Sequence, residues 1–247
     1  MFRRIDLTLH RRGHKRRVNL SDFDNLNHVF QIDGEPMQTH PGRSVVRLNI
    51  DGQTCFLKRY WLIGRQVFRR FIAQGLHELA MIDWLNANGF SGPEVVARGV
   101  ATRLGIRTRM FFLMRQVEDE LPLERFYRRN REAVDELTRS LAEHTARLHD
   151  AGFYHRDYSE RHIFVGRATE RLTFRQIDLE RASQGVRQEP NAAADLKTLA
   201  CSIANEDLRT LIEGDFVDRY LECRKTAPPR DTFLQMLAAA QPTKTFE

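Results

Sequence analysis

The sequence predicts an α+β fold of two lobes, a small lobe with an antiparallel sheet and a helix, and a mainly helical large lobe. Three observations support it. Apolar residues alternate on both sides of an Asp-Gly turn at residues 51–52, which predicts a strand hairpin. Apolar residues then recur every three or four positions from about 66 to 88, and again after residue 131. We place the domains at residues 1–115 and 116–247.

The composition is that of a globular protein with a substantial core. Of the 247 residues, 41% are hydrophobic and 29% are charged. The apolar runs fall short of the roughly 20 residues of a membrane helix, and the first residues lack the apolar core of a secretion signal. We therefore expect a cytoplasmic protein. Cys55, Cys201 and Cys223 are far apart and predict neither a disulfide framework nor a zinc site.

Basic residues give the chain a formal net charge of +6 and are densest near its start. Such a cluster can contact nucleic acid, anionic lipid or a phosphorylated substrate, and it also fits a solvated surface. Charge alone therefore selects no partner. The clustered residues are Arg3, Arg4, Arg11, Arg12, Lys15, Arg16 and Arg17.

The first part of the small lobe contains a lysine in an otherwise apolar strand. Residues 1–40 are polar and predict irregular or short-strand structure, and the hairpin follows from Arg43. Lys58 shares one strand face with Phe56 and Tyr60. A buried ammonium group needs an acidic partner. A lysine that extends from the strand edge into solvent is the alternative.

The helix predicted at about 66–88 supplies the acid, Glu78, and we predict a Lys58–Glu78 ion pair. Gly75 is predicted to divide this helix in two. Strands at about 95–100 and 108–114 complete the sheet and lead to a linker at about 115–121.

The large lobe is predicted to begin with a helix at about 131–149. Further helices are expected to open near Asp195 and to cover about 207–223 and 231–239.

The most specific pattern is the stretch from His155 to His162, read His-Arg-Asp-Tyr-Ser-Glu-Arg-His, followed by Gln-Ile-Asp-Leu-Glu-Arg-Ala from residue 176. Strands at about 163–165 and 172–177, with a turn that begins at Gly166, place Asp157 before a hairpin and Asp178 after it. Two acids in this order are typical of a kinase catalytic centre.

Protein kinases have an asparagine five residues after the catalytic aspartate, whereas this chain has His162. With Asp178-Leu in place of Asp-Phe-Gly, the sequence resembles the lipopolysaccharide core kinases of the Kdo/WaaP family over about residues 43–200. The resemblance implies a protein-kinase-like fold and ATP-dependent phosphorylation of a sugar hydroxyl, with heptose of the inner core as acceptor.

The resemblance also implies partners and a location. The partners would be ATP and the lipopolysaccharide core glycolipid, with magnesium as the metal. The basic surface would make a peripheral contact with the anionic cytoplasmic face of the inner membrane. We expect no nucleic-acid partner and a monomeric enzyme.

In this reading Asp157 orients the acceptor hydroxyl and takes its proton, and Asp178 binds magnesium across the phosphate oxygens. His162 is a candidate for both catalysis and metal binding. Because nitrogen suits magnesium poorly, His162 is expected to contact the phosphate or Asp178. His155 is expected to fix the segment that carries Asp178, and Arg156 to hold an acidic neighbour.

Nucleotide binding is assigned to the small lobe and the linker. Lys58, held by Glu78, would contact the α- and β-phosphates. The backbone of Gln116, Val117 and Glu118 would hold adenine. The turn at residues 40–44 has a single glycine and is a weak candidate for the loop that covers the phosphates.

Asp195 has two interpretations. In the resembled fold an acid at this place accepts hydrogen bonds from the catalytic-loop backbone. An acid at a helix N-terminus is equally explained by the helix dipole.

Three alternatives remain open. His149, His155, Asp157, His162 and Asp178 could form a transition-metal hydrolase site, although their spacing matches no ligand motif. The same fold could phosphorylate a protein or a small molecule. A nucleotide-binding pseudokinase is the third reading, favoured by the missing glycine-rich motif and opposed by the retained lysine and acids.

Overall fold

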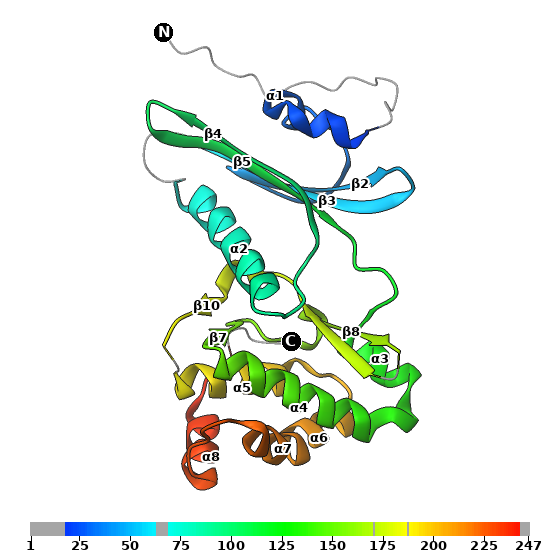
Figure 1. Cartoon of the computed structure of the whole chain (residues 1–247), viewed down its shortest axis with the longest axis vertical. Coiled ribbons are helices and arrows are strands. Elements are labelled where there is room, and N and C mark those ends of the chain that lie inside the picture. The colour runs from blue at the N-terminus through cyan, green and yellow to red at the C-terminus, as the bar shows by residue number, and fades with distance from the viewer. Residues whose placement is uncertain (1–17, 63–68, 170, 187, 243–247) are drawn as a thin grey trace.

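The computed structural model describes residues 18–62, 69–169, 171–186 and 188–242 and confirms the two-lobed α+β architecture (Figure 1). A sheet with the strand order β1-β2-β3-β5-β4 forms the small lobe, and each neighbouring pair is antiparallel. Its strands are β1 (Glu35–His40), β2 (Arg43–Ile50), β3 (Gln53–Trp61), β4 (Val95–Arg103) and β5 (Ile106–Arg115).

Both faces of this sheet are covered, as Figure 1 shows. The 3-10 turn η1 (Leu20–Asp24) and helix α1 (Leu26–Val29) lie over one face, where Phe23 packs with Leu57. Helix α2 (Arg69–Ala87) covers the other face, where Ile82 packs with Phe112. Because β5 contributes side chains to both layers, its residues 110–114 are all buried.

Helix α2 is continuous through Gly75, so the predicted division into two helices is wrong. Gly75 faces the sheet: a Cβ there would lie 2.7 Å from a ring carbon of Tyr60 and 2.9 Å from the sulfur of Met110. The glycine therefore allows the helix to approach the sheet closely. The predicted start of this helix, before Arg69, lies outside the described residues.

Residues 18–40 are more regular than the sequence predicts. Residues 1–17 lie outside the described part of the chain, and residues 18–40 contain η1, α1 and β1. Strand β5 ends at Arg115, next to the predicted domain boundary, which stays a prediction.

The large lobe consists of α3 (Leu123–Arg129), α4 (Val134–Asp150), α5 (Glu189–Ser202), α6 (Glu206–Glu213), α7 (Asp215–Cys223) and α8 (Arg230–Ala239). Sequence reasoning missed α3. The segment predicted as one helix at 207–223 is two helices, because Gly214 leaves the helical conformation with φ −108° and ψ −102°. Among the described residues, none of the helices combines the length and the apolar character that a membrane span requires.

Short strands between the lobes carry the predicted catalytic segment. Strand β7 (Phe153–Tyr154) pairs with β10 (Ser183–Gln184), and β6 (Leu121–Pro122), β8 (Ile163–Ala168) and β9 (Arg171–Gln176) form a small sheet. Gly166 lies within β8 and pairs with Thr173, so the hairpin turn comes later than predicted. The hairpin itself is confirmed.

Candidate active site

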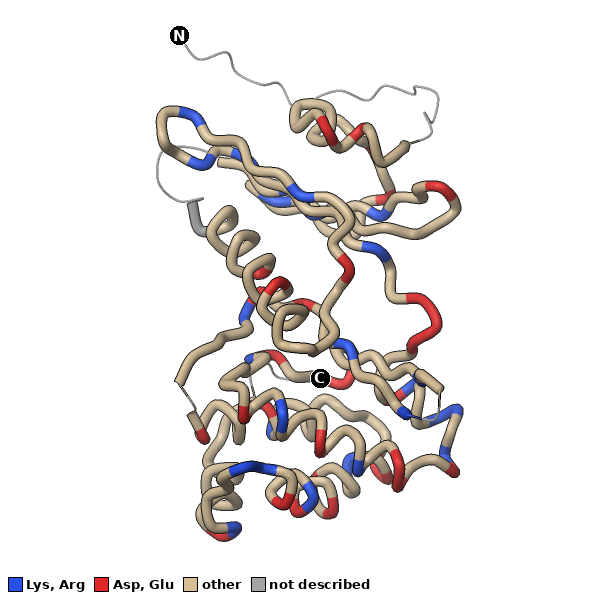
Figure 2. Tube along the Cα trace, viewed as in Figure 1, with Lys and Arg blue, Asp and Glu red and all other residues tan. Residues whose placement is uncertain are grey.

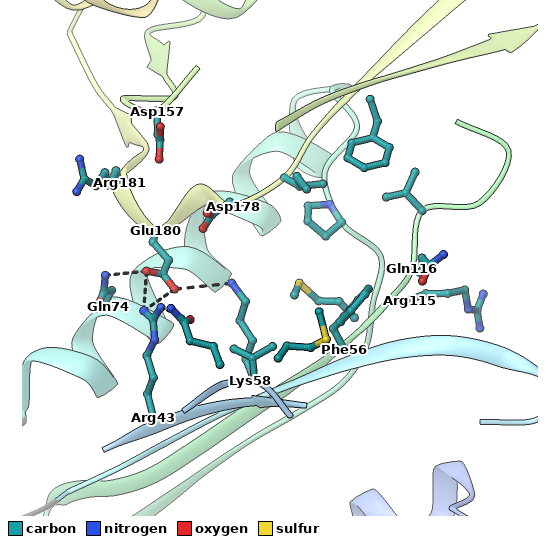
Figure 3. Close-up of a pocket in the computed structure, with 18 residues that line it drawn as sticks. Arg43, Phe56, Lys58, Gln74, Arg115, Gln116, Asp157, Asp178, Glu180 and Arg181 are labelled. Carbon is teal, nitrogen blue, oxygen red and sulfur yellow. Dashed lines mark hydrogen bonds and ion pairs between the residues drawn. The ribbon is translucent and has the colours of Figure 1, made fainter. Parts of the chain in front are cut away.

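A cavity of about 780 Å³ lies between the small-lobe sheet and the segment from Asp157 to Arg181. Figure 3 shows Phe56 and Gln116 on one side of it and Asp157, Glu180 and Arg43 on the other. The first side is largely apolar and the second is charged. The apolar lining includes Val45, Phe56, Met114, Val117, Phe164 and Ile177.

The predicted ion pair between β3 and α2 is present. Lys58 Nζ lies 2.7 Å from Glu78 Oε1 and 2.9 Å from Oε2. The Glu78 side chain is 0% exposed, and the Tyr60 hydroxyl donates to it at 3.4 Å. Burial lowers the pKa of Lys58, but the carboxylates of Glu78, Asp178 and Glu180 outweigh it and raise the pKa above its usual value. Lys58 is therefore a fixed cation on the wall of the cavity.

Glu180 is a second acid beside Lys58 that sequence reasoning missed. Its carboxylate accepts two hydrogen bonds from Arg43, at 2.9 and 2.8 Å, and one from Gln74 at 2.8 Å (Figure 3). Lys58 Nζ lies 3.7 Å from the same carboxylate. Glu180 thus connects the segment after Asp178 with β2 and α2.

The loop that carries Asp157 is held by its backbone. The N–H groups of His155 and Arg156 donate to the Asp195 carboxylate at 2.7 and 2.8 Å. Asp195 lies in the middle of α5, so the helix-dipole interpretation is wrong. The Arg156 guanidinium donates to the amide of Asn191, which replaces the predicted acidic partner.

The αL conformation of Arg156, with φ +62°, belongs to this same loop. A residue other than glycine rarely adopts this backbone conformation, so the two hydrogen bonds from the loop backbone to Asp195 stabilise a strained turn.

Asp157, His162 and Asp178 converge, with one ligand atom from each lying within 4.8 Å of the others. His162 Nδ1 lies 2.9 Å from the carbonyl oxygen of Asp157 and 3.0 Å from Ser159 Oγ. Its Nε2 lies 3.6 Å from Asp178 Oδ2, which agrees with the predicted contact between His162 and Asp178. With the proton on Nδ1, Nε2 points its lone pair towards a carboxylate, an arrangement that a cation between them stabilises.

His155 fixes the strand that ends before Asp178, as predicted. Its Nε2 lies 3.0 Å from the carbonyl oxygen of Ile177, and its ring stacks on His162 with the centroids 5.8 Å apart. Burial lowers the pKa of His155, which favours a neutral ring that donates to Ile177.

His149 lies away from this cluster and bonds to the Tyr220 hydroxyl at 2.8 Å. Of the five ligands considered for a transition-metal hydrolase site, neither His149 nor His155 joins the group of converging ligand atoms. Three of the five are left.

The linker and the first turn also contribute. Gln116 and Val117 line the large cavity, whereas Glu118 lines a smaller one beside it. The Gln116 N–H donates to the carbonyl of Thr54 at 2.8 Å, which ties the linker to β3. Arg43, at the β1–β2 turn, lines the charged side of the cavity. The only sequence signal for Arg43 and Glu180 was their position beside motifs already identified.

A solved structure described as WaaP in complex with acyl carrier protein is similar, with a TM-score of 0.62 and 21% sequence identity. The match covers 86% of this chain and 88% of that chain. No curated protein sequence matched the chain. The lipopolysaccharide kinase (Kdo/WaaP) family matches residues 28–219, most of the sequence, and kinases of this kind transfer phosphate to lipopolysaccharide. The chain therefore belongs to the lipopolysaccharide kinase (Kdo/WaaP) family.

Proposed function

We propose that this lipopolysaccharide kinase transfers the γ-phosphoryl group of ATP to a heptose hydroxyl of the inner core, with Asp157 as the base and Asp178 as the magnesium ligand. One observation carries the proposal: Lys58, which Glu78 holds, lines one cavity with Asp157 and Asp178 although these residues are separated in the sequence. A phosphoryl transferase needs a cation for the phosphates and acids for the metal and the acceptor in this arrangement.

ATP would lie along the cavity from its apolar to its charged side. Adenine fits between apolar side chains such as Val45 and Phe164, next to the backbone of Gln116, Val117 and Glu118. Because the Gln116 N–H is already bonded to Thr54, the base would bind the Gln116 carbonyl and the backbone beyond it. The phosphates would then reach Lys58, the cation that Glu78 holds in place.

The converging acids suit magnesium. Asp157 and Asp178 offer carboxylate oxygens, which a hard cation prefers, and the His162 lone pair faces the same space. Asp178 would hold the ion, and the Nε2 lone pair of His162 would face it from the other side. The ion would neutralise charge on the phosphates.

Asp157 would accept the proton of the heptose hydroxyl. As the sugar oxygen forms its bond to the γ-phosphorus, the bond from that phosphorus to the leaving ADP oxygen breaks, and the proton passes to the Asp157 carboxylate. The two Asp195 hydrogen bonds to the loop keep Asp157 in position, so most of the rate gain would come from positioning and charge stabilisation.

We expect the enzyme to act as a peripheral monomer at the cytoplasmic face of the inner membrane, where the proposed acceptor glycolipid would lie. A protein or small-molecule kinase remains the competing reading, since a fold does not fix the acceptor. The retained lysine and acids oppose a pseudokinase.

The test is phosphate transfer from labelled ATP to purified core glycolipid, compared with peptides and free sugars, followed by mass spectrometry of the core oligosaccharide. We expect transfer to the glycolipid, and a loss of at least about 100-fold in kcat for Asp157→Asn, the usual effect of removing a general base. Asp83→Asn, a surface acid paired with Arg98, is the control. Preference for peptide, or equal rates in the wild type and Asp157→Asn, would overturn the proposal.

A further inference from the structure

The turn between β4 and β5 exposes apolar side chains to an unusual degree. Leu104 at its tip is 93% exposed, and Ile106 and Val100 beside it are 43% and 44% exposed. Leu104 also adopts φ +49°, a backbone conformation that asparagine and glycine adopt more readily than leucine does. Three exposed apolar side chains at one turn form a patch, and such patches mark contact surfaces.

The same hairpin is basic. Residues 95–109 contain four arginines and no acidic residue. Arg98 pairs with Asp83, and Arg109 donates to Asn27 and stacks on Phe30. Arg103 and Arg107, which flank the tip, are exposed and pair with no carboxylate in the part of the chain that the structure describes. Figure 2 shows basic positions on both strands beside this turn.

The register places the tip at the end of the sheet that carries the β1–β2 turn, which we take as the acceptor side because the expected adenine site follows the opposite end. Strand β5 pairs with β3 as far as Arg109, and the hairpin continues to the Arg103–Ile106 pair. At about 3.3 Å per residue this is an extension of about 10 Å. Because the strands are antiparallel, this end of the sheet is also that of the β1–β2 turn, which begins at His40 and ends at Arg43. Gln116, beside the expected adenine site, follows the opposite end.

A second segment also exposes a large apolar residue. Val186, in the connection between β10 and α5, is 84% exposed. In Figure 1 this connection and the β4–β5 turn both form the left edge of the molecule. A flat membrane surface that stands perpendicular to the page along this left edge would touch both segments.

We propose that this margin, the β4–β5 tip (Arg103–Arg107) together with Val186, is the surface that binds an anionic lipid bilayer. Leu104 and Val186 would enter the interface, while Arg103 and Arg107 bind lipid phosphates, a combination that anionic membranes favour. The inference rests on the proposed function, because a bilayer on the acceptor side presents the glycolipid to Asp157. It locates the membrane contact at residues 103–107 and Val186 rather than at the basic residues among the first 17.

The test is co-sedimentation of the full chain with vesicles of phosphatidylglycerol and phosphatidylethanolamine, with phosphatidylcholine vesicles for comparison. Arg103→Gln/Arg107→Gln should weaken partitioning to the anionic vesicles about 30-fold. Arg125→Gln/Arg129→Gln is the matched control, because these arginines are exposed on α3, at the opposite margin of Figure 1. Leu104→Asn, which suits the observed φ, should weaken binding about 10-fold while leaving the turn intact.

Activity separates this inference from the proposed function. The hairpin variants should keep wild-type rates with delipidated core oligosaccharide and lose rate only with glycolipid in anionic vesicles. Vesicle binding that the hairpin variants leave unchanged would overturn the inference while the kinase assignment stands. A dimer that Leu104→Asn converts to a monomer, without lipid binding, would also overturn it. Loss of vesicle binding together with no transfer to either acceptor would support the surface and reject the proposed function.

Discussion

Lys58 faces more negative charge than one ammonium group can balance. Glu78 binds it at 2.7 Å, Glu180 lies at 3.7 Å, and Asp178 adds to the field that raises its pKa. In the proposed function the nucleotide would bring magnesium with it, and the ion would offset this negative charge.

The role of Lys58 can be tested without leaving a buried charge. Because Glu78 is fully buried, Lys58→Ala alone would strand its carboxylate, and breaking a buried pair costs about 3–5 kcal/mol. Lys58→Met/Glu78→Gln removes both charges. We expect native circular dichroism and a KM for ATP raised about 10-fold or more, since a charge-assisted bond contributes about 1.5–3 kcal/mol. An unchanged KM in a folded double variant would remove Lys58 from the nucleotide site.

Glu180 holds the groups that a phosphate would bind. Arg43, Gln74 and Lys58 all direct donors at its carboxylate. Since ATP phosphates need the same donors, Glu180→Gln should lower the KM for ATP several-fold by removing a competing negative charge. Steady-state kinetics would measure it, with Glu136→Gln, a surface acid paired with Arg167, as control. A raised KM would show that Glu180 positions Arg43 for the nucleotide.

At the scale of elements, α2 depends on a close approach to the sheet. A methyl group at Gly75 would lie 2.7 Å from the Tyr60 ring, which is packed beneath the Lys58–Glu78 pair. Gly75→Ala should therefore cost about 1–2 kcal/mol, because overpacking outweighs the better helix propensity of alanine. Urea unfolding would measure it. Gly92→Ala, where the added carbon lies 3.5 Å from Leu85, is the control and should change little.

The contact between α4 and β9 predicts a pH dependence. His144 lies against Phe90 and Phe174 and bonds to Gln176 at 2.9 Å, and burial lowers its pKa to about 4. The unfolded chain, with a histidine pKa near 6.5, binds more protons between these values. Stability is therefore full above about pH 6.5 and falls as the pH drops towards 4.

At pH 5, protonation of this histidine in the unfolded chain should lower the free energy of unfolding by about 2 kcal/mol relative to neutral pH. Urea unfolding at pH 7.5 and pH 5 would measure the loss, and His144→Gln should show a smaller one. If both proteins lose equal stability, His144 is not the titrating group.

The parts of the fold and of the candidate site that could be predicted from the sequence are those that depend on residues close together in the chain. Alternation identified the strands around Lys58, and the motif from His155 to Asp178 predicted that the acids converge, because these features depend on neighbouring residues. The predicted helix break at Gly75 was wrong because the glycine is required by its close contact with Tyr60, a residue on another element. Glu180 was missed for the same reason, since its partner Arg43 lies 137 positions away.

At the scale of the whole molecule, the lobes are joined by apolar packing, in which Leu148 and Phe153 lie in one cluster with residues of α2, and by polar contacts around the cavity. Glu180 bonds to Arg43 and Gln74, and His77 Nε2 lies 2.6 Å from the carbonyl oxygen of Ala182. On the linker side Arg175 donates to the carbonyl of Gly92 at 2.8 Å. A ligand that binds both lobes should therefore add stability to the whole chain.

Magnesium and ATP together should raise the melting temperature more than either alone. A ligand at about 100 times its Kd adds about 2.7 kcal/mol, which corresponds to roughly 5–10 °C for a protein of this size. The magnesium-dependent part should disappear with EDTA and in Asp178→Asn, because the proposed metal would bind the large lobe through Asp178. Asp215→Asn, at the start of α7, should behave like the wild type. An equal shift with and without magnesium in the wild type would mean that ATP binds without a metal at Asp178.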